Sequence, residues 1–504
     1  MTSGPAGVVF PLVQGRRSTA ATGRAVVADA ARATDAGLAA TVERETDWRH
    51  GYVAAFRRLT EVTATSSSAA LTAAVDGLRS VHSRFTFDRG GTDVPLRHAF
   101  AEPEGPALET AEVRGAEDGG PRELTLPYRG QRLAGADLER RLDAWVAAGV
   151  VEPSHADAVR AVASHPEWLD LRDTTAVVLG AGAELGPYVP LVRWGAHVVG
   201  VDLPRPEVWR RLLDRVRASP GRLTFPVRRP LGDDPADGEL LATAGVDLLS
   251  GAPALAQWLA RLPGPYVLGS YVYADGAAHT RASVAVDALT EAVARVRDDV
   301  SLAFLATPTD AFSVPEDAVE QSRERYEGRG LATRAARRTA RVGSAGRLFG
   351  PNYRRLHARE DGQLVGVHDA LVPQQGPNYA LAKRLQRWRA TTARAAGTRV
   401  SVNVAPATRT RSVLRNRALA AAYAGAHRFG IEIFDPSTSN TLMAALLVHD
   451  LRAPGSVADP AVALAHPDEL LWHGANHGGL WRVAYTPRSV LGLAVVLGML
   501  PRGR

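Results

Sequence analysis

A tyrosine and a lysine stand four residues apart in the segment QGPNYALAKRLQ, at Tyr379 and Lys383. The residues around them are typical of a helix, on which this spacing places both side chains on one face. An ammonium beside a phenol favours the ionised phenol, so the tyrosine pKa, ordinarily about 10, is expected to fall. Such a tyrosine can exchange a proton with an alcohol or carbonyl oxygen near neutral pH. The pair therefore predicts general acid–base chemistry.

Lys383 is the only lysine among the 60 lysine and arginine residues. The abundance of alanine, arginine and glycine indicates a GC-rich coding bias, which removes lysine without functional meaning and makes the surviving one notable. Arginine would not replace it, because the broad guanidinium is not a compact point charge. The tetrapeptide GPNY occurs twice, but His357 follows Tyr353 at the lysine position. Only the second copy opens a helix pattern, and we interpret the first as a turn or an accident of composition.

Three glycines stand at a predicted strand-to-helix junction in VVLGAGAELG, at Gly180, Gly182 and Gly186. The first allows a tight turn, and the second lets the backbone approach a pyrophosphate. The start of the following helix would offer free N–H groups to that phosphate. The spacing is G-x-G-x-x-x-G, one residue longer than the usual dinucleotide pattern. The alternative is an ordinary strand–turn–helix unit without a ligand.

A second strand pattern, HVVGVD, ends at Asp202, about 20 residues beyond the glycines. A carboxylate at this position accepts hydrogen bonds from the adenosine ribose and repels a 2′-phosphate. NAD is therefore expected as the cofactor. Arg205 nearby could accommodate the extra phosphate, so NADP stays an alternative.

The elements that must position these residues alternate between strand and helix patterns from Thr174 onward. Further β-like runs are LTFPV, YVLGSYVY, SLAFLAT and TRVSVNVAP, and helical patterns lie at Glu207–Arg217, Pro253–Arg261 and Ser283–Arg297. This alternation predicts an α/β fold, a Rossmann-like doubly wound parallel sheet.

The predicted organisation has three parts. Residues 1–120 form an N-terminal helical region, about Ser18 to His82, and a linker at Ala101–Gly120; residues 121–173 form a helical connector. Residues 174–504 form the Rossmann-like domain, with an insertion at about 314–374 and a C-terminal extension at about 451–504. The arginine-rich stretch Ser322–Glu360 is expected to be either a solvated loop or a lid that recognises an anionic substrate group.

Taken in order, these motifs resemble the short-chain dehydrogenase/reductase superfamily over about Thr174 to Leu414, interrupted by the insertion. By that resemblance Tyr379 would be the general acid/base, and Lys383 would hold the nicotinamide ribose and lower the tyrosine pKa. In VNVAPATRT, Pro406 and Thr408, or Thr410 in its place, would touch the nicotinamide end.

The resemblance also implies a hydroxyl residue at the end of the fifth strand, which orients the substrate oxygen. Thr307 is favoured over Thr309 and Ser313, although serine is the usual residue. The family's strand-four Asn-Ala-Gly reads YADGAAH here, from Tyr273 to His279, and the helical asparagine of the family's proton relay is not found in that region.

The sequence thus predicts an NAD(P)-dependent oxidoreductase that interconverts a carbonyl and an alcohol on an unidentified small molecule, anionic or bulky in one interpretation. An epimerase or lyase that uses bound NAD transiently is one alternative. A catalytically inactive dinucleotide-binding sensor or scaffold is another, and homo-oligomer formation stays open.

Composition excludes several other classes. Hydrophobic residues make up 45% of the 504 residues, enough for a large core. The absence of cysteine excludes disulfide frameworks and thiolate chemistry, and it favours a reducing, cytoplasmic setting. The net charge is +7, but no nucleic-acid-binding pattern is present. His473 and His477 stand four apart in a glycine-rich run that argues against a helical metal site, so no metal is expected.

No signal peptide is expected at the N-terminus, and no run reaches the roughly 20 apolar residues that a membrane span needs. The most apolar stretch, SVLGLAVVLGML at Ser489–Leu500, is expected to be a buried helix or strand. A membrane contact is the alternative, but stable membrane insertion is not expected.

Overall fold

A seven-stranded sheet forms the centre of the protein in the computed structural model, which describes residues 7–116, 123–232, 235–328 and 330–500. The strand order is β17-β13-β12-β9-β10-β11-β6, and all neighbours are parallel except β11 and β6. The strands are β9 (Thr175–Leu179), β10 (His197–Val201), β11 (Arg222–Val227), β12 (Tyr266–Ser270), β13 (Val300–Ala306), β17 (Val400–Val404) and β6 (Glu109–Arg114).

The central strands are apolar throughout because the sheet is buried on both faces. In β9, Val177 and Leu179 pack into the core on one face, whereas Ala176 and Val178 pack into the core on the other. When the six parallel strands are numbered by their occurrence along the chain, they lie side by side in the order 3-2-1-4-5-6. This strand order is compatible with a Rossmann-like fold. The prediction of a mixed α/β fold with a mainly parallel sheet is confirmed.

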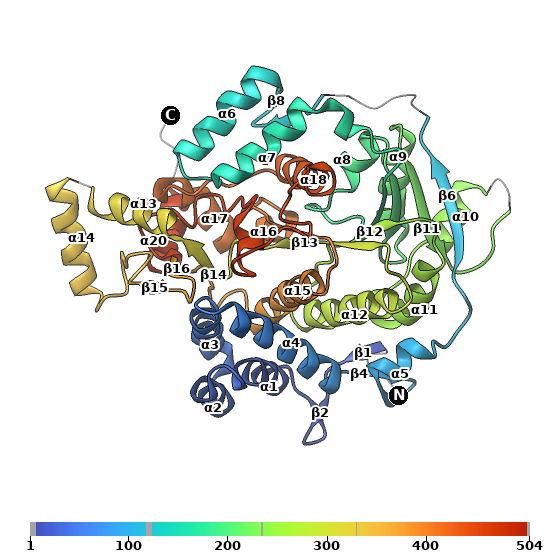
Figure 1. Cartoon of the computed structure of the whole chain (residues 1–504), viewed down its shortest axis with the longest axis horizontal. Coiled ribbons are helices and arrows are strands. Elements are labelled where there is room, and N and C mark those ends of the chain that lie inside the picture. Colours follow the sequence, from blue (N-terminus) through green and yellow to red (C-terminus); the bar gives the residue numbers. More distant parts are fainter. Residues whose placement is uncertain (1–6, 117–122, 233–234, 329, 501–504) are drawn as a thin grey trace.

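The helices lie in two layers (Figure 1). The N-terminal helices cover one face together with α11, α12 and α15, and the connector helices cover the other together with α8, α9 and α18. The first layer comprises α1 (Thr19–Arg32), α2 (Ala36–Arg44), α3 (Trp48–Thr63), α4 (Ser67–Arg84), α11 (Leu248–Ala260), α12 (Ala277–Ala294) and α15 (Pro377–Ala395). The second comprises α6 (Gly135–Ala147), α7 (Pro153–Ser164), α8 (Tyr188–Arg193), α9 (Pro206–Arg217) and α18 (Pro436–Arg452).

Polar side chains cap the first turns of three of the N-terminal helices. Ser18, Asp35 and Ser66 accept hydrogen bonds from backbone N–H groups in the first turns of α1, α2 and α4, respectively. Between α3 and α4, the chain ends one helix at Thr63 and begins the next at Ser67 with a capped first turn. These helices share one hydrophobic core with the sheet.

The linker prediction for Ala101–Gly120 is wrong at its centre, because Glu109–Arg114 forms edge strand β6. Only one of its six residues, Ala111, is buried, so the segment lacks the apolar alternation that identifies a strand. Pairing with β11, more than a hundred residues later, is what makes it a strand.

The insertion contains a small antiparallel sheet and two helices, so it is not a solvated loop throughout. These elements are β14 (Ala311–Pro315), α13 (Glu316–Glu327), α14 (Leu331–Gly343), β15 (Leu356–Ala358) and β16 (Leu364–Asp369). In the first GPNY copy, the buried Tyr353 donates a hydrogen bond to the Trp481 carbonyl oxygen at 2.6 Å. Asn352 beside it donates to the Leu480 carbonyl oxygen at 3.0 Å. This copy anchors the C-terminal segment.

A buried ion-pair cluster joins the connector, the insertion and the C-terminal extension. The Arg482 guanidinium donates to both carboxylate oxygens of Glu152, at 2.7 and 2.6 Å, and to Asp317 at 2.6 Å. His477 Nε2 lies 2.8 Å from the same Glu152 carboxylate. Although burial opposes ionisation, hydrogen bonds from Arg482 and His477 lower the Glu152 pKa to about 2. His477 thus belongs to a structural cluster, and His473 lies outside it.

The last helix in the described part of the C-terminal extension is α20 (Pro487–Met499), which packs against α17 (Arg417–Ala426). The prediction that this apolar stretch is buried holds for one side of the helix only, because Val496 and Met499 are 57% and 64% exposed. Within the described ranges, no helix is both long and apolar enough to cross a membrane.

Candidate functional site

The predicted site residues gather at the carboxyl edge of the sheet, around β9, β12 and β13. In this topology the strand order reverses between β9 and β12, and ligands of such sheets bind beyond the carboxyl ends at that point. Gly180 directly follows β9, Asp202 follows β10, Thr307 follows β13 and Pro406 lies just beyond β17. The insertion ends at the start of α15, which carries Tyr379 back to the same edge.

The glycine turn has the tight conformation that the sequence predicts. Gly180 adopts a φ of +84°, and its N–H donates to the Val201 carbonyl oxygen at 2.8 Å. A Cβ added to Gly180 would lie 3.1 Å from the backbone of Tyr271, so the turn passes close beside the end of β12. The backbone here requires glycine for both conformation and space.

Asp202 is held against this turn. Its Oδ2 accepts a hydrogen bond from the Gly182 N–H at 2.7 Å, and its Oδ1 accepts one from the Leu203 N–H at 2.8 Å. Burial raises the pKa of the carboxyl despite these bonds and the nearby Arg211 and Arg205. A carboxylate is thus positioned next to the second glycine, where the sequence places the ribose contact.

The helix after the glycines differs from the prediction. Gly186 donates to Ala183 within the turn, and α8 begins only at Tyr188 and has six residues, including Pro190. The helix predicted after the glycines is therefore present but short, and it begins two residues beyond Gly186. Any anion binding at this turn would depend on the turn backbone itself.

An acidic side chain in the turn contacts the loop after β17. The Glu184 carboxylate accepts from the Arg411 backbone N–H at 2.8 Å and pairs with the Arg411 Nε at 3.2 Å. Arg411 begins the short helix α16 (Arg411–Arg415). The loop from Pro406 to Arg411 therefore crosses from the end of β17 to the glycine turn. Glu184 thus places a carboxylate, paired with the Arg411 guanidinium, at the glycine turn.

If the turn binds NAD(H) as the sequence predicts, Glu184→Gln should strengthen that binding by up to about fivefold, because one negative charge leaves the turn and partly exposed charges contribute at most about 1 kcal/mol. Fluorescence titration with NADH measures the change, and the gain should shrink as salt rises. Asp173→Asn, a surface carboxylate paired with Arg452, is the control. Weaker binding by Glu184→Gln would instead mean that the contact with Arg411 shapes the cofactor site.

Tyr379 and Thr307 lie side by side at the end of β13. A hydrogen bond with the Thr307 side chain lowers the pKa of the Tyr379 phenol, but burial raises it more, so the pKa lies above its usual value. The expected decrease caused by Lys383 is thus wrong for this structure. The reason is geometric, because the Lys383 ammonium donates to the Leu305 carbonyl oxygen at 3.2 Å and to Gln386 at 3.1 Å.

Burial also affects Lys383 itself and lowers the pKa of its ammonium to about 8, although the carboxylate of Asp310 opposes this. Asp310 is buried and pairs with Arg387 at 3.0 Å and with Arg384 at 3.4 Å. A proton on Lys383 is therefore held less firmly than on an exposed lysine.

His279 is a member of this site that the sequence did not identify. It lies in the first turn of α12, and its ring centroid is 5.4 Å from that of Tyr379. The Nδ1 atom lies 2.9 Å from the Ala274 carbonyl oxygen, whereas the buried Nε2 has no hydrogen-bond partner among the described residues. Burial, and then the charge of Lys383, lower the His279 pKa to about 3. The imidazole is neutral and has one unused nitrogen.

The structure separates the remaining hydroxyl candidates. Thr309 lies 2.9 Å from Thr307 and accepts a hydrogen bond from Gln375, whereas Ser313 lies within β14 and donates to Asp468. Thr408 is buried and hydrogen-bonds to Ser439 at 2.7 Å. Thr307 is thus the hydroxyl beside Tyr379, and Thr408 is held by α18.

The arginines of the insertion divide into two groups. Arg325 donates to the carbonyl oxygens of Arg482 and Ala148, and Arg337 stacks over the Tyr326 ring at 3.8 Å. Arg338, Arg354 and Arg355 are exposed. The helix α14 lies at the outer end of the molecule, to the left of β14 and β16 in Figure 1.

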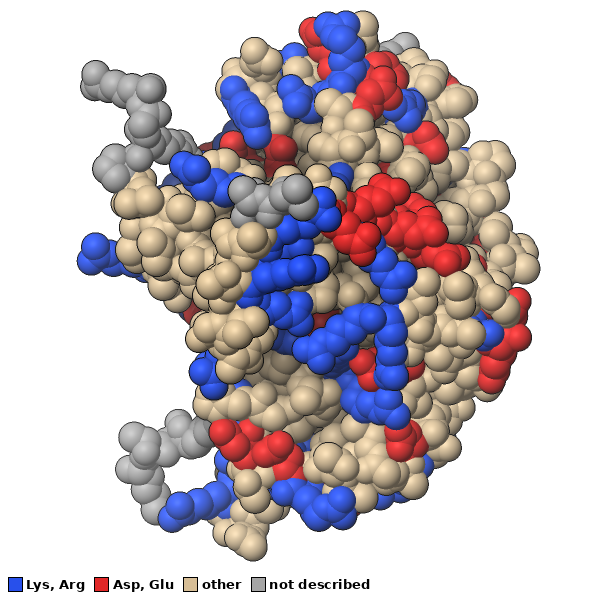
Figure 2. Space-filling model, turned by 90° about the vertical axis from the view of Figure 1, so that its left-hand side faces the viewer, with Lys and Arg blue, Asp and Glu red and all other residues tan. Residues whose placement is uncertain are grey.

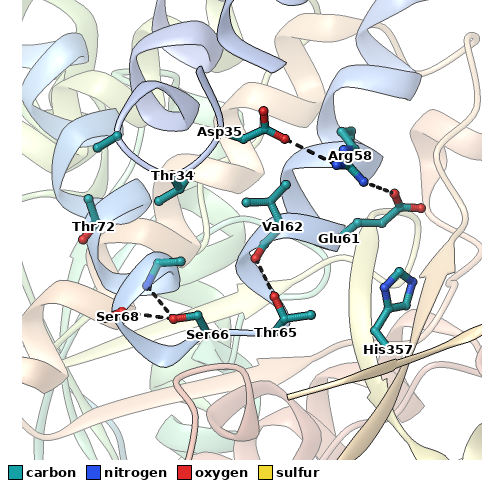
Figure 3. A pocket seen from close by; sticks show the side chains of 12 residues that line it. Thr34, Asp35, Arg58, Glu61, Val62, Thr65, Ser66, Ser68, Thr72 and His357 are labelled. Atoms are coloured by element: carbon teal, nitrogen blue, oxygen red, sulfur yellow. Dashed lines mark hydrogen bonds and ion pairs between the residues drawn. The ribbon is translucent and has the colours of Figure 1, made fainter. Parts of the chain in front are cut away.

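A separate open depression lies between the N-terminal helices and β15 (Figure 3). Its volume is about 580 Å³, and polar residues such as Asp35, Arg58, Glu61 and His357 line it. Several of its hydroxyls already bond within the chain, as Ser66 does with the Ala69 N–H. None of the residues predicted for the site lines this depression.

Comparison with known proteins does not assign the chain to a family. No model of a protein family matches it, and no curated protein matches its sequence.

Proposed function

We propose that the chain is an NAD(P)-dependent oxidoreductase that interconverts a carbonyl and an alcohol on a small molecule. The observation that carries the proposal is the position of Tyr379 beside Thr307 at the carboxyl edge of a sheet whose first turn is the glycine turn at Gly180. The arrangement supports the resemblance to short-chain dehydrogenases/reductases, which is itself part of the proposal.

The residues fit a dinucleotide in part. The close approach at Gly180 and the carboxylate of Asp202 suit the adenosine end, whereas Glu184 opposes the phosphates. Pro406, just beyond β17, would lie near the nicotinamide end. When bound, the nicotinamide would supply or accept the hydride.

The proton would be handled by the chain's own side chains. Tyr379 would give its proton to the substrate oxygen during reduction and take it back during oxidation. Thr307 would hydrogen-bond the same oxygen, and the neutral His279 ring would pack beside the phenol. The raised pKa of Tyr379 keeps the phenol protonated, which suits a proton donor more than a base.

A dinucleotide-binding sensor without turnover is the second candidate. The raised Tyr379 pKa favours it, because a phenol that keeps its proton does not act as the base of an oxidation. Cofactor binding with no hydride transfer to any carbonyl compound tested would support this reading.

The first test is titration of the protein with NAD(H) and NADP(H). We expect tighter binding of NAD(H), because the Asp202 carboxylate would repel a 2′-phosphate. Asp202→Asn should reduce the preference. Absence of binding by all four nucleotides would refute both candidate functions, and tighter NADP(H) binding would mean that Arg205 or another arginine controls the choice.

Lys383→Arg should weaken cofactor binding and lower turnover although the charge is kept. The ammonium occupies a buried position between the Leu305 carbonyl oxygen and Gln386, which the larger guanidinium does not fit. Titration and steady-state kinetics measure the two effects, with Arg389→Lys as a swap in the opposite direction on the same helix. Parent-like behaviour would show that the lone lysine has no special role.

A further inference from the structure

The helix α20 presents an apolar side to the surface. Val496, Met499 and Leu500 are 57%, 64% and 54% exposed, and no charged residue occurs from Ser489 to Leu500. Exposed helix faces of globular proteins are normally polar. An exposed face made only of Leu, Val, Met and Gly indicates an interaction surface.

The helix is firmly seated on its other side. A Cβ added to Gly498 would lie 1.9 Å from the Ala421 carbonyl oxygen, and one added to Gly425 would lie 2.0 Å from that of Ala494. Such close backbone contact fixes α20 against α17. The exposed side is therefore a preformed feature.

Two segments that are rich in arginine and contain no acidic residue lie beside this helix. The segments 328–359 and 401–431 contain nine and five arginines, respectively, and no aspartate or glutamate. The first touches α20 through the Phe349 N–H, which donates to the Ser489 carbonyl oxygen, and the second contains α17. Within the described chain, Arg409, Arg415, Arg417 and Arg428 form no ion pair.

The resulting face combines apolar and basic surface. Figure 2 looks onto the end of the molecule where α14, α17 and α20 lie in Figure 1, and it shows an uncharged prominence beside a broad run of blue side chains. Acidic side chains gather beyond that run.

We propose that this face, formed by α20 and the arginines of α16 and α17, docks the protein on the surface of an anionic lipid bilayer. The apolar side chains would enter the headgroup region, and the arginines would contact anionic headgroups, as in peripheral amphipathic helices. A second copy of the chain fits less well, because it would bring the same basic segments together. A nucleic acid would leave the apolar side without a partner. The proposal is independent of the oxidoreductase function.

Flotation of the full-length protein with vesicles tests this docking. Binding is expected to vesicles of phosphatidylglycerol and phosphatidylcholine in equal amounts, and not to phosphatidylcholine alone. Val496→Asp and Met499→Asp should each reduce binding about tenfold or more. Arg415→Gln and Arg417→Gln should each reduce it about fivefold, with a smaller effect at high salt. Val296→Asp, at a valine that is 68% exposed just after α12, is the matched control and should bind like the parent.

Light scattering of the same variants tests the alternative that a second copy of the chain covers α20. A parent dimer that Val496→Asp converts to monomer, with no vesicle binding, would overturn the proposal in favour of a second copy. Failure of the parent to bind anionic vesicles, or parent-like binding by both aspartate variants, would also overturn it. Each of these results is independent of nucleotide titration.

Discussion

Turnover by Tyr379→Phe is expected to fall by about 10²–10⁴-fold, the usual contribution of a positioned general acid or base. The phenol lies beside Thr307 and is the proton donor of the proposed reaction. NAD(H) affinity should stay near that of the parent, because the variant keeps the ring against His279 and leaves the glycine turn unchanged. Steady-state kinetics and fluorescence titration separate the two effects.

The first GPNY copy supplies the control for this experiment. Tyr353→Phe removes a buried hydroxyl from the same tetrapeptide, where it donates to the Trp481 carbonyl oxygen. This variant should lose stability by about 0.5–1.5 kcal/mol, because it removes one buried hydrogen bond while Asn352 still donates to the same carbonyl oxygen at 3.5 Å, and its folded fraction should turn over normally. Retained activity in Tyr379→Phe would remove the proposed reaction, and lost nucleotide binding would give the tyrosine a structural role.

Arg482→Leu is expected to lower the free energy of unfolding by about 3–5 kcal/mol, the usual loss when one member of a buried ion pair is removed. Glu152 would keep its charge inside the protein with only His477 as a close partner. Denaturant unfolding measures the change. The double variant Glu152→Leu with Arg482→Leu should recover part of the loss, because no buried charge is then left without its counterion.

The pH dependence of this effect has a defined sign. The folded pKa of Glu152, about 2, lies below its ordinary 4.5, so the stability that the pair contributes is present above pH 4.5 and is lost as the pH falls toward 2. The difference in the free energy of unfolding between the parent and Arg482→Leu should therefore narrow as the pH falls from 4.5 toward 2. If the free energy of unfolding of Arg482→Leu were lower than that of the parent by the same amount at pH 3 and at pH 7, the lost stability would arise from packing.

The sheet could be predicted because its signals are local. Each parallel strand is a short apolar run buried on both faces, and all six lie where the sequence indicates them. Edge strand β6 could not be found in this way, because Glu109–Arg114 has no apolar pattern and becomes a strand only by pairing with β11. The small sheet of the insertion depends on similar non-local pairings.

The site residues likewise divide into those with a local signal in the sequence and those that only the folded structure identifies. Gly180, Asp202, Thr307 and Tyr379 belong to ordered motifs, so their common position at the carboxyl edge follows from the topology. His279 gave no signal, because a histidine near a helix start is uninformative until α12 and α15 are neighbours. The contact of Glu184 with Arg411 joins residues 227 positions apart, and the raised Tyr379 pKa depends on burial that spacing alone does not reveal.

The cluster around Glu152 also affects how the chain is made. Glu152 and Arg482 are 330 positions apart, and ribosomes add about 5–20 residues each second, so roughly 20–70 s separate the synthesis of the two partners. Until Arg482 emerges, burying Glu152 would bury a carboxylate without its counterion. The first GPNY copy likewise lacks the carbonyl oxygens of Leu480 and Trp481. The connector and the insertion therefore cannot complete this ion-pair cluster until Arg482 has been synthesised.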